Sequence, residues 1–127
     1  MKTKICTSIE QSKKLIELRI DKNTADMHYF YDGYNPTKLD VGYDKDNAKY
    51  YRGTENKYIP AWSLSALLQL MPITCDVIKD FHNRYYCSNK FDDNDFDTWH
   101  LTTSCENPID AAVEMVVWLL KNGYIKD

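Results

Sequence analysis

Residues 107–123 read NPIDAAVEMVVWLLKNG, and they form the clearest structural signal in the chain. Asn107 is a favourable N-cap, and Pro108 stands at the first helical position, where its missing N–H costs nothing. The apolar residues that follow recur at helical spacing, and Gly123 supplies a C-terminal cap. The stretch therefore predicts a closing helix, and its apolar density requires that other elements cover most of its surface.

Two further helices are predicted upstream of this one. The sequence TSIE at 7–10 has the form of a capping box with Thr7 as the N-cap, and an amphipathic stretch follows it. Ser63 is a good N-cap for a second helix over 64–71, which Pro72 stops. Both helices are short and need the remaining chain to cover their apolar stripes.

Alternating apolar and polar residues predict strands between the helices. The predicted strands cover 25–31, 73–81, 84–87 and 98–103, with a turn at His82-Asn83 and a loop over 88–97. In the second of them, the alternation buries Cys75 beside Ile73 and Val77. This order of elements predicts a single α+β domain over 1–127. We expect an antiparallel sheet of about four to five strands, with about three helices packed mainly on one face.

The stretch over 32–57 is the least regular part of the chain and is rich in tyrosine. It is predicted as a variable excursion with strand potential at 49–52. Long irregular segments are often functional or mobile, and aromatic side chains are enriched at protein interfaces. The candidate binding residues are Tyr34, Tyr43, Tyr50, Tyr51, Arg52 and Arg84. For the four tyrosines, a contact surface and a mobile loop remain equally open.

Composition limits the classes of function. With 43% hydrophobic and 28% charged residues, the chain has a globular composition, and its net charge of −3 argues against broad binding to a phosphate backbone. No apolar run has the length of a signal peptide or membrane span, so a cytoplasmic setting is expected. The four cysteines form no Cys-x-x-Cys pair and are expected to be reduced structural thiols. We expect no cofactor.

No metal site and no catalytic residue can be assigned from motifs. The acidic run at 92–97 lacks the Gly and Glu that an EF-hand needs at its sixth and twelfth positions. No nucleophile elbow, Gly-rich phosphate loop or zinc-protease motif is present. An acid–base pair could still be built from His28 or His100 with an Asp such as Asp26 or Asp97, because histidine titrates near neutrality.

Four strings carry a resemblance to a known group of proteins. They are IPAWSLSALL at 59–68, ENPIDAA at 106–112 with MVVWLL at 115–120, and TADM at 24–27. The chain resembles short proteins, without assigned activity, of gut Bacteroides-type bacteria and of their prophages and mobile elements. The resemblance implies a bacterial or phage source, a cytoplasmic setting and an accessory role, and it assigns no site residues.

Three functional hypotheses follow. The leading one is a small non-enzymatic module that binds a protein partner or itself, through the tyrosine-rich excursion and nearby strand faces. The second is a small enzyme that uses His28 or His100 with an Asp. The third is a weak binder of single-stranded nucleic acid through Arg52, Arg84 and neighbouring tyrosines, which would require affinity that falls steeply with salt.

Overall fold

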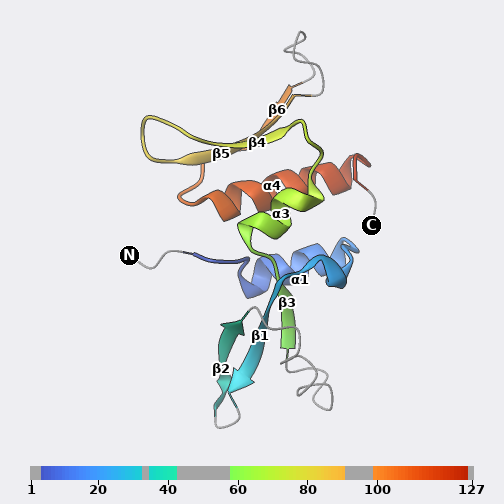
Figure 1. The fold of residues 1–127 in the computed structure, drawn as a ribbon, viewed down its shortest axis with the longest axis vertical. Coiled ribbons are helices and arrows are strands. Elements are labelled where there is room, and N and C mark those ends of the chain that lie inside the picture. The colour runs from blue at the N-terminus through green and yellow to red at the C-terminus, as the bar shows by residue number, and fades with distance from the viewer. Residues whose placement is uncertain (1–3, 33–34, 43–57, 91–98, 126–127) are drawn as a thin grey trace.

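The computed structural model describes residues 4–32, 35–42, 58–90 and 99–125 (Figure 1). In chain order the elements are α1 (Ile9–Glu17), the 3-10 helix η1 (Lys22–Thr24), β1 (Met27–Asp32), β2 (Asn35–Gly42), β3 (Tyr58–Ala61), α3 (Leu64–Leu70), β4 (Cys75–Lys79), β5 (Tyr85–Lys90), β6 (Trp99–Leu101) and α4 (Pro108–Lys121). The α+β class, the three α-helices and the antiparallel pairing of the strands are confirmed in these residues.

The strands are divided between two sheets, where the sequence had suggested one. The first sheet has the order β2-β1-β3, and the second has the order β4-β5-β6. The sheets lie at opposite ends of the longest axis, with the three α-helices between them (Figure 1). The second sheet packs on α4, whereas α1 contacts β3 of the first. The helices therefore supply the surface on which both sheets are assembled.

The closing helix α4 begins and ends as its sequence predicts. The Asn107 side chain accepts a hydrogen bond of 2.8 Å from the backbone N–H of Asp110, and Pro108 occupies the first turn. Gly123 follows the helix with φ of +75°, a left-handed conformation that favours glycine. Seven residues of α4 are buried, so this helix is the centre of the hydrophobic core.

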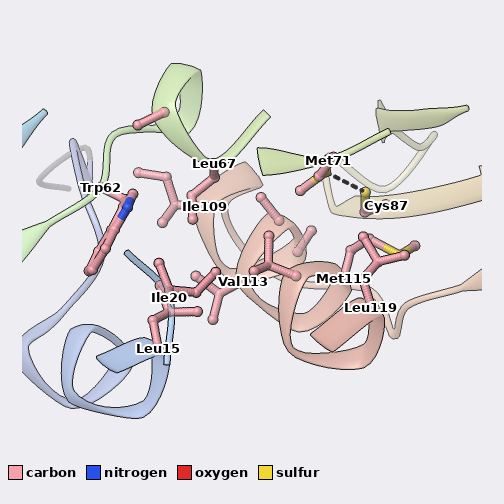
Figure 2. Packing of buried hydrophobic residues seen from close by; sticks show 14 of the residues in the cluster. Leu15, Ile20, Trp62, Leu67, Met71, Cys87, Ile109, Val113, Met115 and Leu119 are labelled. Atoms are coloured by element: carbon pink, nitrogen blue, oxygen red, sulfur yellow. Dashed lines mark hydrogen bonds between the residues drawn. The ribbon is translucent and has the colours of Figure 1, made fainter. Parts of the chain in front are cut away.

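The hydrophobic core joins α1, α3 and α4 to the second sheet, as can be followed in Figure 2. Met115 and Leu119 of α4 pack near Met71 and Cys87, whose sulfur atoms are 3.9 Å apart. At the other end of the core, Leu15 of α1 and the indole of Trp62 are fully buried. A single apolar cluster therefore runs from α1 through α3 and α4 to the second sheet.

The N-cap of α1 is Ser8, one residue later than predicted. The Ser8 hydroxyl accepts from the Gln11 backbone N–H at 3.1 Å, and the Gln11 side chain accepts from the Ser8 N–H at 2.9 Å, which completes a capping box. Thr7 was wrong as the cap because its hydroxyl is used elsewhere. It bonds to Ser12 at 2.7 Å and accepts from the backbone N–H of Trp62 at 3.1 Å.

A polar cluster ties the N-terminal segment to α1 and α4. Lys4 donates to the carboxylate of Asp110 at 2.7 Å and to Gln11 at 2.7 Å, and Gln11 also donates to Asp110 at 2.7 Å. Burial alone would raise the pKa of Asp110, but the hydrogen bonds from Lys4 and Gln11 outweigh it and lower that pKa. The cluster therefore stabilises the charged form of Asp110 beside the helix N-terminus.

Two strands of the first sheet were not predicted. Both contain a proline, Pro36 in β2 and Pro60 in β3, and proline cannot donate a hydrogen bond within a sheet. The structure places β1 in the centre, so that β2 and β3 are the outer strands, where proline is tolerated. The predicted strand at 49–52 lies outside the described residues.

Candidate functional site

The strand β4 forms one edge of the second sheet. Among the described residues it pairs only with β5, in a register that sets Val77 opposite Cys87. Cys75 and Val77 pack against the core that α4 provides, and Asp76 is exposed. An edge strand carries backbone N–H and C=O groups that a further strand can bind.

Fully exposed apolar side chains stand at both ends of this strand. Ile73 precedes β4 with a relative exposure of 101%, and Phe81 follows it with 103%. The expectation that Ile73 is buried beside Cys75 was wrong, because β4 covers only Cys75–Lys79 and the alternating pattern continues into the turns at both ends. Because Ile73 and Phe81 lie beyond the strand, neither is directed onto α4 by the pleat.

The turn that carries Phe81 is held by Asp80. The Asp80 carboxylate accepts hydrogen bonds from the backbone N–H groups of His82 at 2.8 Å and Arg84 at 3.1 Å. Both hydrogen bonds lower the pKa of Asp80, and the bond from Arg84 has the larger effect. Asn83 adopts φ of 59°, a left-handed conformation that asparagine tolerates better than most residues. The predicted turn at His82-Asn83 is confirmed, and it presents the Phe81 ring to solvent.

The other end of β4 is held from β5. Thr74 donates its hydroxyl proton to the side-chain oxygen of Asn89 at 2.6 Å, and its carbonyl accepts from the N–H of Lys90 at 3.1 Å. Asn89 is fully buried. The strand β5 therefore continues to Lys90, into the stretch predicted as a loop, because pairing with β4 and β6 extends it. The hydrogen bonds of Thr74 therefore fix the backbone beside Ile73, whose side chain is exposed to solvent.

Most of the binding residues predicted from the sequence, namely Tyr34, Tyr43, Tyr50, Tyr51 and Arg52, lie outside the described residues. Arg84 is described, and it stands just before β5. Its guanidinium donates to the hydroxyl of Ser104 at 3.0 Å and to the carbonyl of Ser104 at 2.9 Å. The geometry gives Arg84 a role in joining the β4–β5 turn to the segment before α4.

The two histidines considered as general bases belong to different sheets. His28 lies in β1 with 4% exposure, and His100 lies in β6. The His100 ring stacks on Trp118, with ring centroids 3.8 Å apart and planes 7° from parallel. Burial lowers the pKa of His100, and the nearby carboxylate of Glu114 opposes this shift. His100 is therefore a stacking partner of α4, and burial favours the neutral form of its ring. Asp97 lies outside the described residues.

Burial raises the pKa of every cysteine thiol. The pKa of Cys87 rises to about 12, and those of Cys75 and Cys105 rise to about 11. Cys6 shifts in the same direction. Cys105 also donates to the Glu114 carboxylate at 3.3 Å, which stabilises the thiol over the thiolate. Because the thiolate is the reactive form, these residues are poor nucleophiles at neutral pH.

These shifts predict low thiol reactivity in the folded protein. At pH 7.5 we expect iodoacetamide to leave Cys87 unmodified, because its side chain is fully buried and its pKa is about 12. Peptide mass spectrometry after alkylation, with and without urea, measures this. All four thiols should react fully in urea. Rapid native modification of Cys87 would contradict the packing of β5 on α4.

A polar pocket of about 300 Å³ lies between η1 and α3. It is lined by Asn23, Thr24, Asp26, Gln69 and neighbouring aliphatic residues. The Asp26 carboxylate accepts from both the backbone N–H and the hydroxyl of Ser63, the N-cap of α3. The carboxylate of Asp26 therefore stabilises the N-terminus of α3 through its hydrogen bonds to Ser63.

Comparisons with protein-family models, curated proteins and solved structures found no match. In the part of the chain that the structure describes, no three His, Cys, Asp or Glu side chains are grouped closely enough to hold a metal ion. Across the same residues, no helix has both the length and the apolar character needed to cross a membrane. The strongest feature of the described surface is the β4 edge with Ile73 and Phe81.

Proposed function

We propose that this protein is a small non-enzymatic module that acts through contacts with protein, and that the β4 edge with Ile73 and Phe81 is its contact surface. The observation that carries the proposal is the full exposure of both side chains, one at each end of an edge strand. Burying an Ile or Phe side chain contributes about 1.5–3 kcal/mol. A partner strand that covered both would gain this energy together with backbone hydrogen bonds.

The rigidity of the surface supports the same proposal. Asp80 and Thr74 fix the two turns through hydrogen bonds of 2.6 to 3.1 Å. A contact surface that is already ordered loses less entropy on binding. The face of the sheet beside this edge adds the half-buried pair Ile78 and Tyr86. A partner on this edge would therefore meet apolar surface at the strand ends and beside the strand.

The predicted contact role of the tyrosine-rich excursion remains part of the proposal, as a second region beside the β4 edge. The resemblance to short proteins of bacteria and their mobile elements favours an accessory function, and protein contact is the simplest chemistry for that function. The stacking of the His100 ring on Trp118 and the poor reactivity of the thiols favour protein contact over catalysis.

The test compares complexes in an extract of the source cell. The tagged full chain should elute in size exclusion above its monomer mass of 14.9 kDa. Because they remove the two exposed apolar side chains, the substitutions Ile73→Ser and Phe81→Ser together should return it to the monomer position. Both residues are exposed, so the melting temperature should change little.

Ile5→Ser provides the matched control, because Ile5 is 50% exposed on the N-terminal segment, away from β4. This control should elute with the unsubstituted chain. The proposal would be wrong if the unsubstituted chain eluted as a monomer in the extract, or if the double variant remained in the larger complex.

A further inference from the structure

We propose that the partner at this edge is a second copy of the chain, with the two β4 strands paired antiparallel about a two-fold axis at Val77. The inference rests on the proposed function and specifies its partner. Three features of β4 support it: the direction of its backbone groups, the positions of Ile73 and Phe81, and the order of its charges.

The backbone groups of alternate residues point away from β5. The N–H of Asp80 donates to the carbonyl of Arg84 at 2.8 Å, and the N–H of Lys90 donates to the carbonyl of Thr74 at 3.1 Å. Hydrogen-bonded positions alternate along an antiparallel strand. The residues between 74 and 80 that bond to β5 are therefore 76 and 78, and the outward groups belong to Cys75, Val77 and Lys79. The N–H of Cys75 already donates to the carbonyl of Pro72 at 3.1 Å, so the edge offers a partner strand the carbonyl of Cys75 and the backbone groups of Val77 and Lys79.

The exposed apolar residues are placed symmetrically about the middle outward residue. Ile73 lies four residues before Val77, and Phe81 lies four residues after it. In an antiparallel pair centred on Val77, Ile73 of each copy is level with Phe81 of the other. A two-fold interface needs a surface that is complementary to itself. This register covers both exposed side chains in each copy.

The charges of β4 favour the antiparallel arrangement. Asp76 and Lys79 lie on opposite sides of Val77. The antiparallel register sets Lys79 of one copy opposite Cys75 of the other and Asp76 opposite Ile78, so that no like charges are paired across the two strands. A parallel pair in register would bring Asp76 beside Asp76 and Lys79 beside Lys79, and like charges that face each other across strands are destabilising.

The first experiment measures the dissociation constant of the purified full chain by sedimentation across a dilution series. Lys79→Pro is compared with Lys79→Thr. Both substitutions remove the ammonium group and its contact over the ring of Tyr85, which lies 5.8 Å away, but only proline removes the outward N–H. Because two N–H groups are lost per dimer, proline should raise the dissociation constant at least about tenfold relative to threonine.

The second experiment tests the register by cross-linking. Asp76 of one copy should lie directly opposite Ile78 of the other, at a spacing that a disulfide can bridge. A mixture of Asp76→Cys and Ile78→Cys chains, oxidised with glutathione disulfide, should form far more covalent dimer than either variant alone. Unsubstituted chains treated in the same way should form none. Equal cross-linking in the separate variants would overturn the register.

The outcomes separate this inference from the proposed function. A chain that is monomeric at every concentration overturns self-pairing. Equal dissociation constants for the two Lys79 variants overturn pairing through the edge. If either result is found while Ile73→Ser with Phe81→Ser still dissolves the complex in the extract, the partner is another protein and the proposed function stands. If the complex in the extract is also absent, both the self-pairing and the proposed function are wrong.

Discussion

Replacing Trp62 with alanine is expected to lower the free energy of unfolding by about 3–5 kcal/mol. Trp62 is the largest of the fully buried side chains, and it stands between β3 and α3. Its indole N–H donates to the hydroxyl of Thr24 at 2.9 Å, and its carbonyl accepts from the N–H of Thr7 at 2.9 Å. Alanine would leave a cavity and remove the N–H that donates to the hydroxyl of Thr24, which would keep its bond to the carbonyl of Asp21 at 2.6 Å.

The size of this effect decides whether the chain remains folded, since domains are stable by only about 5–15 kcal/mol. Urea denaturation followed by circular dichroism measures it. Trp62→Phe is the control, because it keeps a ring in the core and loses the indole N–H. We expect it to cost less than alanine. If alanine cost no more than phenylalanine, Trp62 would not fill the core as Figure 2 shows.

Replacing Leu119 with alanine should cost about 2–5 kcal/mol. Leu119 is fully buried on α4 and belongs to the cluster that joins this helix to the second sheet (Figure 2). Leu68→Ala on α3 removes the same atoms from a side chain that is 40% exposed. The difference between these two losses in urea denaturation therefore reports burial alone.

The free energy of unfolding should fall clearly less for Leu68→Ala than for Leu119→Ala, because solvent already contacts part of the Leu68 side chain and a smaller cavity forms. Equal losses would contradict the packing of α4 on the second sheet. Phe81→Ser extends the series to a side chain that is fully exposed. The free energy of unfolding of Phe81→Ser should change by no more than about 0.5 kcal/mol. Any loss of association in that variant would then come from the lost contact with the partner and not from unfolding.

The helices could be predicted because the signals that begin and end them are local. Asn107 and Ser63 act as N-caps as their sequence context indicates, and Gly123 ends the last helix in the left-handed conformation. The error in the N-cap of α1 is a shift of one residue, from the observed Ser8 to Thr7. Thr7 and Ser8 are both good caps, and the choice between them depends on Trp62, whose N–H bonds to Thr7 from 55 residues away.

The candidate site was missed because the alternating pattern does not show where a strand ends. Ile73, Val77 and Phe81 share one phase of the alternation, and the sequence predicted one strand through all three. The strand ends at Lys79 because the Asp80 carboxylate bonds to the N–H groups that follow it and turns the chain. Pro72 before Ile73 and His82-Asn83 after Phe81 were the available signals that both residues lie beside turns.

The sequence by itself determined the α+β class, the three helices and the N-caps of α3 and α4, because these depend on side chains within one or two turns of each other. The tertiary structure alone decided that the strands form two sheets, that β2 and β3 are outer strands, and that β4 is an edge. These features depend on pairing between distant segments and on the surface that α4 provides. The exposure of Ile73 and Phe81 follows from that arrangement.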